Sequence, residues 1–322
     1  MPTPTMASQH YDAVLSNISL AYMQAQTNFI AHQVFPIVPV DKQSGVYFTY
    51  PKDEWLRDSA QKRADATESA GSGYTLATDS YQTDVYAFHK DVGAQAVANA
   101  TAPLNPMAEA AVFASSRILL RQELDFANSF FKTGVWGTDW VGHASTNTGT
   151  NFIQFSNYST STPIETIDRA KEAVVGVTGF DVNTMVVGKA VFNVLKNHPA
   201  IIDRIKYTSA DVVTEQLLAK YFGVEKFLVA KALVNSSKEG QANSIGYVYA
   251  DSILLTHSAA NPGLLTPSAG YTFAWTGYSG LGAGTYQIPM PLAKATRIEA
   301  EASWVNKVVA ADLGIFLSDV VA

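Results

Sequence analysis

Two adjacent carboxylates are the most obvious candidates for chemistry in this sequence. Asp53 and Glu54 could in principle act as a general acid and a general base, as the paired carboxylates of glycoside hydrolases do. Adjacent side chains of a strand, however, point to opposite faces, and four cations lie within the same segment, from Lys52 to Arg63. Mixed charge of this kind favours a solvated loop or a docking surface over an active site.

The other reactive residue types form no recognisable site. The chain has no cysteine, which excludes disulfides, thiolate nucleophiles and cysteine-based zinc sites. The six histidines are scattered, HExxH and GxSxG are absent, and the glycine-rich stretch at 277–284 lacks the GxGxxG spacing. His198 precedes Pro199 and is expected to cap a helix. We therefore predict no catalytic residue, no metal site and no cofactor; the protein is not expected to be an enzyme.

Composition limits the possible partners. The net charge is −6 and there is no long basic run, so the basic face that DNA and RNA binders usually show is not predicted. No apolar run approaches the roughly 18–20 residues that span a bilayer, so no membrane partner is expected. Within the charged segment, Trp55 and Arg57 are the residue types that dominate protein interfaces. The segment is therefore predicted to find and orient partner chains.

The elements that must position this segment begin with an arm and a hairpin. Residues 1–44 are apolar, and Pro36 and Pro39 favour extended backbone. Such an arm must bury its side chains against another surface: other copies of the chain, or alternatively its own long helix. Residues 45–82 predict two strands joined by the charged segment, in a hairpin that is too poor in aliphatic residues to hold a core and should project.

A long helix and an α/β unit follow. Asn105 and Pro106 predict an N-cap and a first helical position, and the helix should run to about residue 133. Its large apolar residues form two adjacent rows that predict one broad buried stripe: Val112, Leu119, Phe126 and Phe130, beside Phe113, Leu120, Leu124 and Phe131. Residues 163–290 combine helix and strand patterns, and 296–320 predict two further strands.

In the order and combination of several stretches, the chain resembles the major capsid proteins of tailed bacteriophages. The stretches are VFPIVPVDKQSGVYFTYPKDEWLRDSAQKRADATESAGSGY (34–74), YAFHKDV (86–92), RQELDFANSFFKTGVWG (121–137), NTMVVGKAVFNVLKNHPAIIDRIKY (183–207) and PSAGYTFAW (267–275). The resemblance implies the α+β tailed-phage major-capsid fold. Its parts would be an N-terminal arm (1–44), an extended loop (45–82), a peripheral domain (83–162, with the spine helix at 105–133), an axial domain (163–290) and return strands of the peripheral domain (291–322).

The same resemblance implies a structural protein of the virion. Copies of the chain would form hexamers and pentamers of an icosahedral shell around double-stranded DNA, assembled in the host cytoplasm without sequence-specific DNA binding. A separate scaffolding protein, a portal and a decoration protein are the other implied partners. Two alternatives remain: the shell of a cellular protein-cargo compartment, and a carboxylate-based hydrolase.

The expected contacts between subunits lie in the arm and the charged segment. They are Phe35, Asp53, Glu54, Trp55, Arg57, Arg63 and Glu68.

Overall fold

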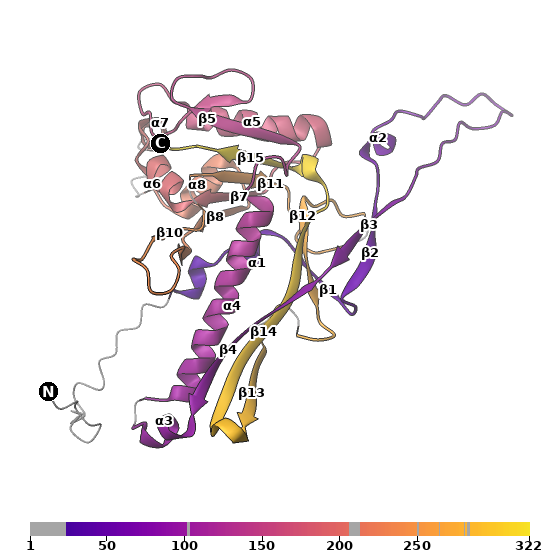
Figure 1. Cartoon of the computed structure of the whole chain (residues 1–322). Helices are drawn as coiled ribbons and strands as arrows, with labels where there is room; N and C mark the ends of the chain where they lie inside the picture. The colour runs from indigo at the N-terminus through magenta and orange to yellow at the C-terminus, as the bar shows by residue number, and fades with distance from the viewer. Residues whose placement is uncertain are drawn as a thin grey trace.

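The computed structural model describes residues 24–101, 104–205, 213–249, 251–263, 265–279, 281 and 284–322. These residues form an elongated layer of one sheet and one long helix, joined to a more compact α/β unit (Figure 1). The elongated layer holds a five-stranded sheet in which β14 is central. Its strands are β1 (Ile37–Val40), β12 (Gly270–Trp275), β14 (Ala295–Val308), β13 (Gly284–Met290) and β4 (Asp84–Gly93).

The compact unit is built on a six-stranded mixed sheet. In spatial order its strands are β6 (Asn151–Ile153), β5 (Thr138–His143), β15 (Gly314–Ser318), β11 (Ile253–Thr256), β7 (Thr184–Gly188) and β8 (Lys226–Ala230). Its helices are α5 (Pro163–Thr178), α6 (Lys189–Asn197), α7 (Pro199–Ile205) and α8 (Glu215–Phe222). A small hairpin of β9 (Leu233–Asn235) and β10 (Ile245–Tyr247) extends from this unit.

The central strands of this sheet are buried on both faces. Met185 and Val187 of β7 pack in the core with α5 to α8, whereas Val186 between them packs with Phe126 and Phe130 on the other side. Alternate residues of a strand point to opposite faces, so a strand covered on both sides is apolar throughout. This explains why TMVVG (184–188) shows no alternation of apolar and polar residues.

The long helix α4 (Pro106–Phe130) spans roughly 37 Å at 1.5 Å per residue and covers one face of the five-stranded sheet. As predicted, Asn105 is its N-cap: its Oδ1 accepts the N–H of Ala108 at 3.2 Å. A short helix, α3 (Ala94–Asn99), links β4 to this region.

The predicted apolar stripe of α4 is wrong over its first half. Val112 is 47% exposed and Phe113 is 38% exposed. The buried positions there are Ala110, Ala114 and Ile118, and Ala114 and Ile118 pack with Ala300, Ala302 and Trp304 of β14. Small residues on both sides let the helix approach the sheet closely, and Val112 and Phe113 lie outside this buried contact.

The expectation that the arm is buried by other copies is wrong for residues 29–35. Phe29, Ile30, Val34 and Phe35 are buried within the single chain, where most of them pack with the C-terminal half of α4. The arm forms a one-turn helix, α1 (Ala31–Val34), and then β1, which pairs in parallel with β12. The alternative, an arm folded onto its own helix, holds for these residues; residues 1–23, including Tyr22, lie outside the described part.

Several strands pair in a different sheet from the one that the sequence predicted. β15 was expected in the peripheral sheet, but it pairs with β11 and β5 in the compact unit. β12 and β13 were assigned to the axial domain, yet both pair with β14. β5 and β6 lie in the compact sheet although 83–162 was assigned to the peripheral domain. Local patterns predict that a strand exists, but its partner is chosen by long-range packing.

Candidate functional site

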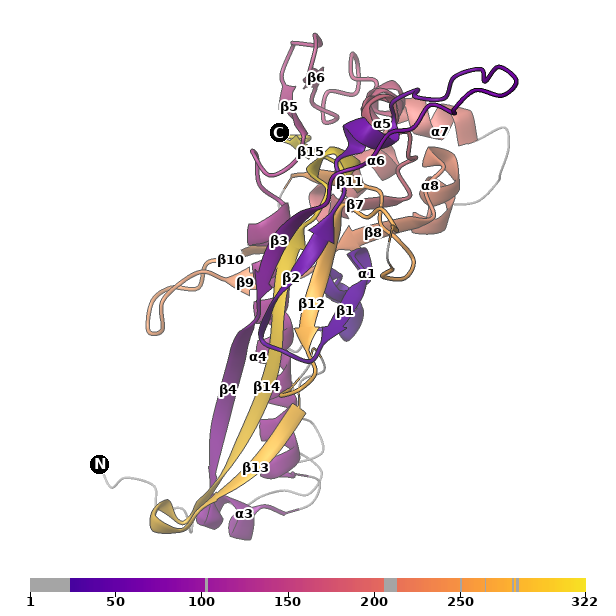
Figure 2. The same ribbon diagram turned by 90° about the vertical axis from the view of Figure 1, so that its right-hand side faces the viewer.

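A loop projects from the fold on a two-stranded stem. β2 (Ser44–Thr49) pairs antiparallel with β3 (Ala77–Gln82), and every residue from 60 to 80 is exposed. Figure 1 shows the loop extending well beyond the rest of the chain. The stem rests on the face of the five-stranded sheet opposite α4 (Figure 2), where the rings of Tyr47 and Tyr81 lie 5.4 and 4.6 Å from that of Phe273. The sheet therefore aims the loop away from the core.

The loop narrows to a neck just above the stem. Tyr50, Trp55 and Tyr74 form an aromatic trio with ring centroids 5.6 to 6.2 Å apart. Glu54 crosses the neck and accepts hydrogen bonds from the N–H and the hydroxyl of Thr75. The neck joins the two ends of a loop that has no regular structure between residues 56 and 76, so it determines where the loop leaves the molecule.

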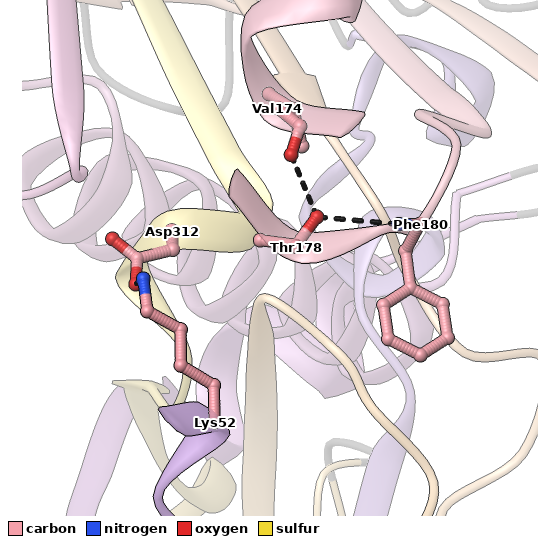
Figure 3. A network of polar contacts seen from close by, with 5 residues as sticks. All are labelled: Lys52, Val174, Thr178, Phe180 and Asp312. Carbon is pink, nitrogen blue, oxygen red and sulfur yellow. Dashed lines mark hydrogen bonds and ion pairs between the residues drawn. The ribbon is translucent and has the colours of Figure 1, made fainter. Parts of the chain in front are cut away.

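A groove of about 1,100 Å³ lies beside the neck. It is lined by the neck, the end of α5 and the segment 309–313, and its exposed apolar residues include Phe48, Leu56, Phe180 and Leu265. Lys52 reaches across to Asp312 as an ion pair (Figure 3). Both side chains are partly exposed, so the pair positions the loop more than it stabilises the fold. Lys52 and Asp312 are 260 residues apart in the sequence, and no sequence pattern predicts their contact.

The predicted contact residues fall into three places. Asp53, Glu54 and Trp55 lie together in the one-turn helix α2 (Lys52–Trp55), and Trp55 is 55% exposed. Arg57, Arg63 and Glu68 follow along the exposed loop. Phe35 was predicted as a contact between subunits, but it is 2% exposed and packs against the rings of Phe126, Phe130 and Trp136. That assignment is wrong, because the side chain has no surface left to offer; for the other six it stays a prediction.

The carboxylate pair does not form a catalytic arrangement. Asp53 and Glu54 lie in a single helical turn between the two strands, and Glu54 is bonded to Thr75. Asp312, the other carboxylate that lines the groove, is paired with Lys52. Within the described ranges, no group of three or more acidic or histidine side chains could hold a metal ion. No helix in the same ranges is long and apolar enough to cross a bilayer.

His198 caps a helix, as the sequence predicted. The imidazole is buried, its Nδ1 accepts the N–H of Ala200 at 3.2 Å at the start of α7, and its Nε2 lies 3.0 Å from the hydroxyl of Ser161. Because Nδ1 is an acceptor, the neutral ring carries its proton on Nε2. Burial lowers the pKa of His198 below its ordinary value.

The titration of His198 is therefore expected to make a contribution to the stability of the free subunit that is lost on acidification. The unfolded chain protonates His198 near the ordinary pKa of 6.5, whereas the folded chain binds that proton only at lower pH. The stabilisation is complete above pH 6.5 and is lost as the pH falls through the folded pKa, by at most about 1.4 kcal/mol per pH unit. Urea unfolding over a pH series should show a shallower dependence for His198→Asn, which keeps a capping oxygen. Equal slopes for the two proteins would contradict this role.

Glu123, which the sequence analysis did not single out, joins the arm to α4. Its side chain is completely buried, and its oxygens accept the N–H groups of Ile30 and Ala31 at 2.9 to 3.1 Å, at the N-terminus of α1. Burial raises the pKa of Glu123, while the hydrogen bonds from Ala31 and Ile30 act in the opposite direction. The only sequence signal was an acidic residue inside an apolar helix stripe.

Two curated phage proteins are similar to this chain in sequence. The chain is 27% identical over 234 residues to the major capsid protein of Burkholderia phage BcepMu, covering 71% of each chain. It is 26% identical to the major capsid protein of Pseudomonas phage JBD67, covering 97% of each chain. No protein-family model matches the chain. The resemblance to phage major capsid proteins is confirmed by these relatives.

Solved structures share the fold. A phage-related protein from Bordetella bronchiseptica RB50 aligns with a TM-score of 0.67 at 21% identity, covering 92% of this chain and 93% of that one. The mature capsid of bacteriophage PhiM1 gives 0.60 at 11% identity, covering 96% and 90%. The SrpI encapsulin of Synechococcus elongatus PCC 7942 gives 0.57 at 12%, covering 99% and 96%. The α+β phage major-capsid fold expected from the sequence is therefore confirmed.

Proposed function

We propose that this chain, a homologue of phage major capsid proteins, assembles into hexamers and pentamers that build the icosahedral shell around the double-stranded DNA of a tailed phage. The observation that carries the proposal is the projecting loop, taken together with the two phage relatives. An exposed loop of both charges has little to contact in its own subunit. In the shell, a neighbouring copy of the chain lies against the neck and the groove and gives the loop a protein surface to contact.

The other partners follow from the same proposal. Copies of the chain are the main partner, with a separate scaffolding protein and a portal during assembly in the host cytoplasm, and a decoration protein as a further candidate. The finished location is the virion. The shell encloses DNA without reading its sequence.

A cellular compartment shell is the second candidate, because the encapsulin shares the fold over nearly the whole chain. The fold cannot separate the two functions, since phage capsids align equally well. Sequence favours the phage shell: the two curated relatives are phage major capsid proteins. A packaging terminase among the genomic neighbours would support the phage shell, and a cargo enzyme would support the compartment.

Loop charges are expected to matter for assembly and not for folding. Arg57→Ala and Glu68→Ala should each lower the yield and heat resistance of shells while the free subunit unfolds as wild type does. A charge pair desolvated across an interface is worth roughly 2–5 kcal/mol when one partner is truncated. An exposed pair is worth under about 1 kcal/mol, and repetition over the shell amplifies either value.

The matched controls are Lys132→Ala and Glu172→Ala, which remove exposed charges outside the loop. Shells should be counted by electron microscopy and subunit stability measured by urea unfolding. In addition, trypsin should cut after Arg57 and Arg63 in free subunits and not in shells. Wild-type shell yield from both loop variants, or equal cleavage before and after assembly, would count against the loop as an assembly surface.

A further inference from the structure

Cationic and aromatic side chains meet in a strip along the seam between α4 and β4. Phe113, Arg117 and Arg121 follow one another at helical i, i+4 spacing, and Tyr86, Phe88 and Lys90 alternate along β4. Figure 1 shows α4 lying along β4. We call Lys90, Arg117 and Arg121 the cationic strip.

The rings hold the cations in place at the surface. The guanidinium of Arg117 lies 4.9 Å from the centroid of Phe113, and the ammonium of Lys90 lies 5.5 Å from the same ring. Arg121 lies 5.2 Å from the ring of Tyr86. All three cations are exposed, and none forms an ion pair with a carboxylate of the described residues. Stacking on a ring leaves the N–H groups at the edge of a guanidinium free to donate.

Two glutamates that form no ion pair among the described residues lie on the face of the sheet opposite the cationic strip. Ile298, Ala300 and Ala302 of β14 face α4, so Glu299 and Glu301 between them point away from it. Glu301 is close enough to Tyr278 to raise the pKa of that phenol. On the same face, Asp91 and Arg297 neutralise each other in an ion pair. The two glutamates therefore lie on the face away from the cationic strip, which Lys307 of β14 shares, while Asp125 of α4, bonded to Trp304 and Asn306, lies on the strip's side of the sheet.

We propose that the cationic strip binds the phosphate backbone of double-stranded DNA without reading its sequence. This inference rests on the proposed function and names the surface through which the shell meets its contents. Arg117 and Arg121 are one helical turn apart, roughly 6 Å, and duplex DNA carries a charge every 1.7 Å or so along its axis. A duplex lying along α4 would therefore offer phosphates to all three cations.

The contact is weak in one subunit and strong in a shell. Three phosphate contacts give a modest, salt-sensitive affinity, but many strips facing one DNA molecule act together. Contacts between these cations and phosphates carry no sequence information, which fits binding without sequence preference. The competing occupant is an acidic segment of another copy of the chain.

The test uses full-length, unassembled subunits and a fluorescent DNA duplex of random sequence, titrated over a series of salt concentrations. Each phosphate contact contributes about 0.9 to the slope of log affinity against log salt. The wild-type slope should fall by roughly 2.7 when all three cations are neutralised together. That variant carries Lys90→Gln, Arg117→Gln and Arg121→Gln.

Two controls isolate the position of the charges. A variant with Lys132→Gln, Lys220→Gln and Lys238→Gln has the same net charge and should keep the wild-type slope. Arg117→Lys with Arg121→Lys keeps the local charge and should retain most of the slope. If thermal unfolding shows that the triple strip variant is not folded, the single variant Arg117→Gln replaces it in the test. This variant should lower the slope by about 0.9.

Three results would overturn the inference: no DNA binding by wild type at low salt, an unchanged slope in the strip variant, or an equal loss in the distant-charge control. A strip variant that keeps DNA binding but no longer forms shells would place another copy of the chain on the strip, and would also overturn it. Electron microscopy of the same preparations separates this outcome from failure of the proposed function, in which wild type itself forms no shells.

Discussion

Glu123→Ala is expected to lower the unfolding free energy of the free subunit by about 2–5 kcal/mol. The carboxylate is completely buried, and it accepts both Ile30 N–H and Ala31 N–H. Alanine leaves two buried donors without an acceptor, each costing roughly 1–3 kcal/mol. The arm can escape part of this penalty by detaching from α4, so the loss should appear first as faster hydrogen exchange in residues 30–40.

Glu123→Gln is the matched control, because it keeps the length of the side chain and one acceptor oxygen. It should lie between wild type and Glu123→Ala. Since burial raises the pKa of Glu123, the stability contributed by its titration is present at low pH and is lost as the pH rises through the folded pKa. The glutamine variant lacks this dependence. A change within about half a kcal/mol for Glu123→Ala would show that the contact does not hold the arm.

Phe126→Ala is expected to cost about 3–5 kcal/mol, the usual range for a buried phenylalanine. Phe126 is fully buried, and its ring centroid lies 5.9 Å from that of Phe35 and 4.8 Å from that of Phe130. The ring joins the arm, α4 and the compact unit in one cluster. Its removal therefore opens a cavity where three parts of the chain meet.

Val112→Ala provides the comparison for this prediction. The sequence pattern places Val112 and Phe126 in one apolar row, but the valine is exposed, and its replacement should change stability by less than about 0.5 kcal/mol. Both values come from urea unfolding of free subunits. Similar losses for the two variants would mean that the buried face of α4 has been misassigned.

Local sequence signals predicted where helices and strands occur better than they predicted which of them pack or pair with one another. Asn105 and Pro106 located the start of α4 because capping is decided by neighbouring residues. The face of α4 was missed because the closest contact uses Ala110 and Ala114, and hydrophobic patterns weight large side chains over small ones. Where α4 packs close to Ala300 and Ala302 of β14, the size of the helix side chains matters as well as their polarity.

Long-range pairings were not readable from the sequence. Pro36 and Pro39 correctly indicated extended backbone around β1, but its partner, β12, lies more than 200 residues later. Phe35 was assigned to other copies for the same reason, since its pocket is made by α4 and Trp136. The projection of the loop was easier to predict, because a charged segment with few aliphatic residues cannot form a core of its own. Its contacts with other copies remain a prediction.

Assembly itself is the central claim, and one measurement tests it most directly. The full-length chain should be expressed alone and together with its neighbouring genes, and each preparation examined by electron microscopy with light scattering on the same sample. We predict closed, hollow shells of uniform size in at least one of the two preparations. A single monomeric species under every condition in both would contradict the account.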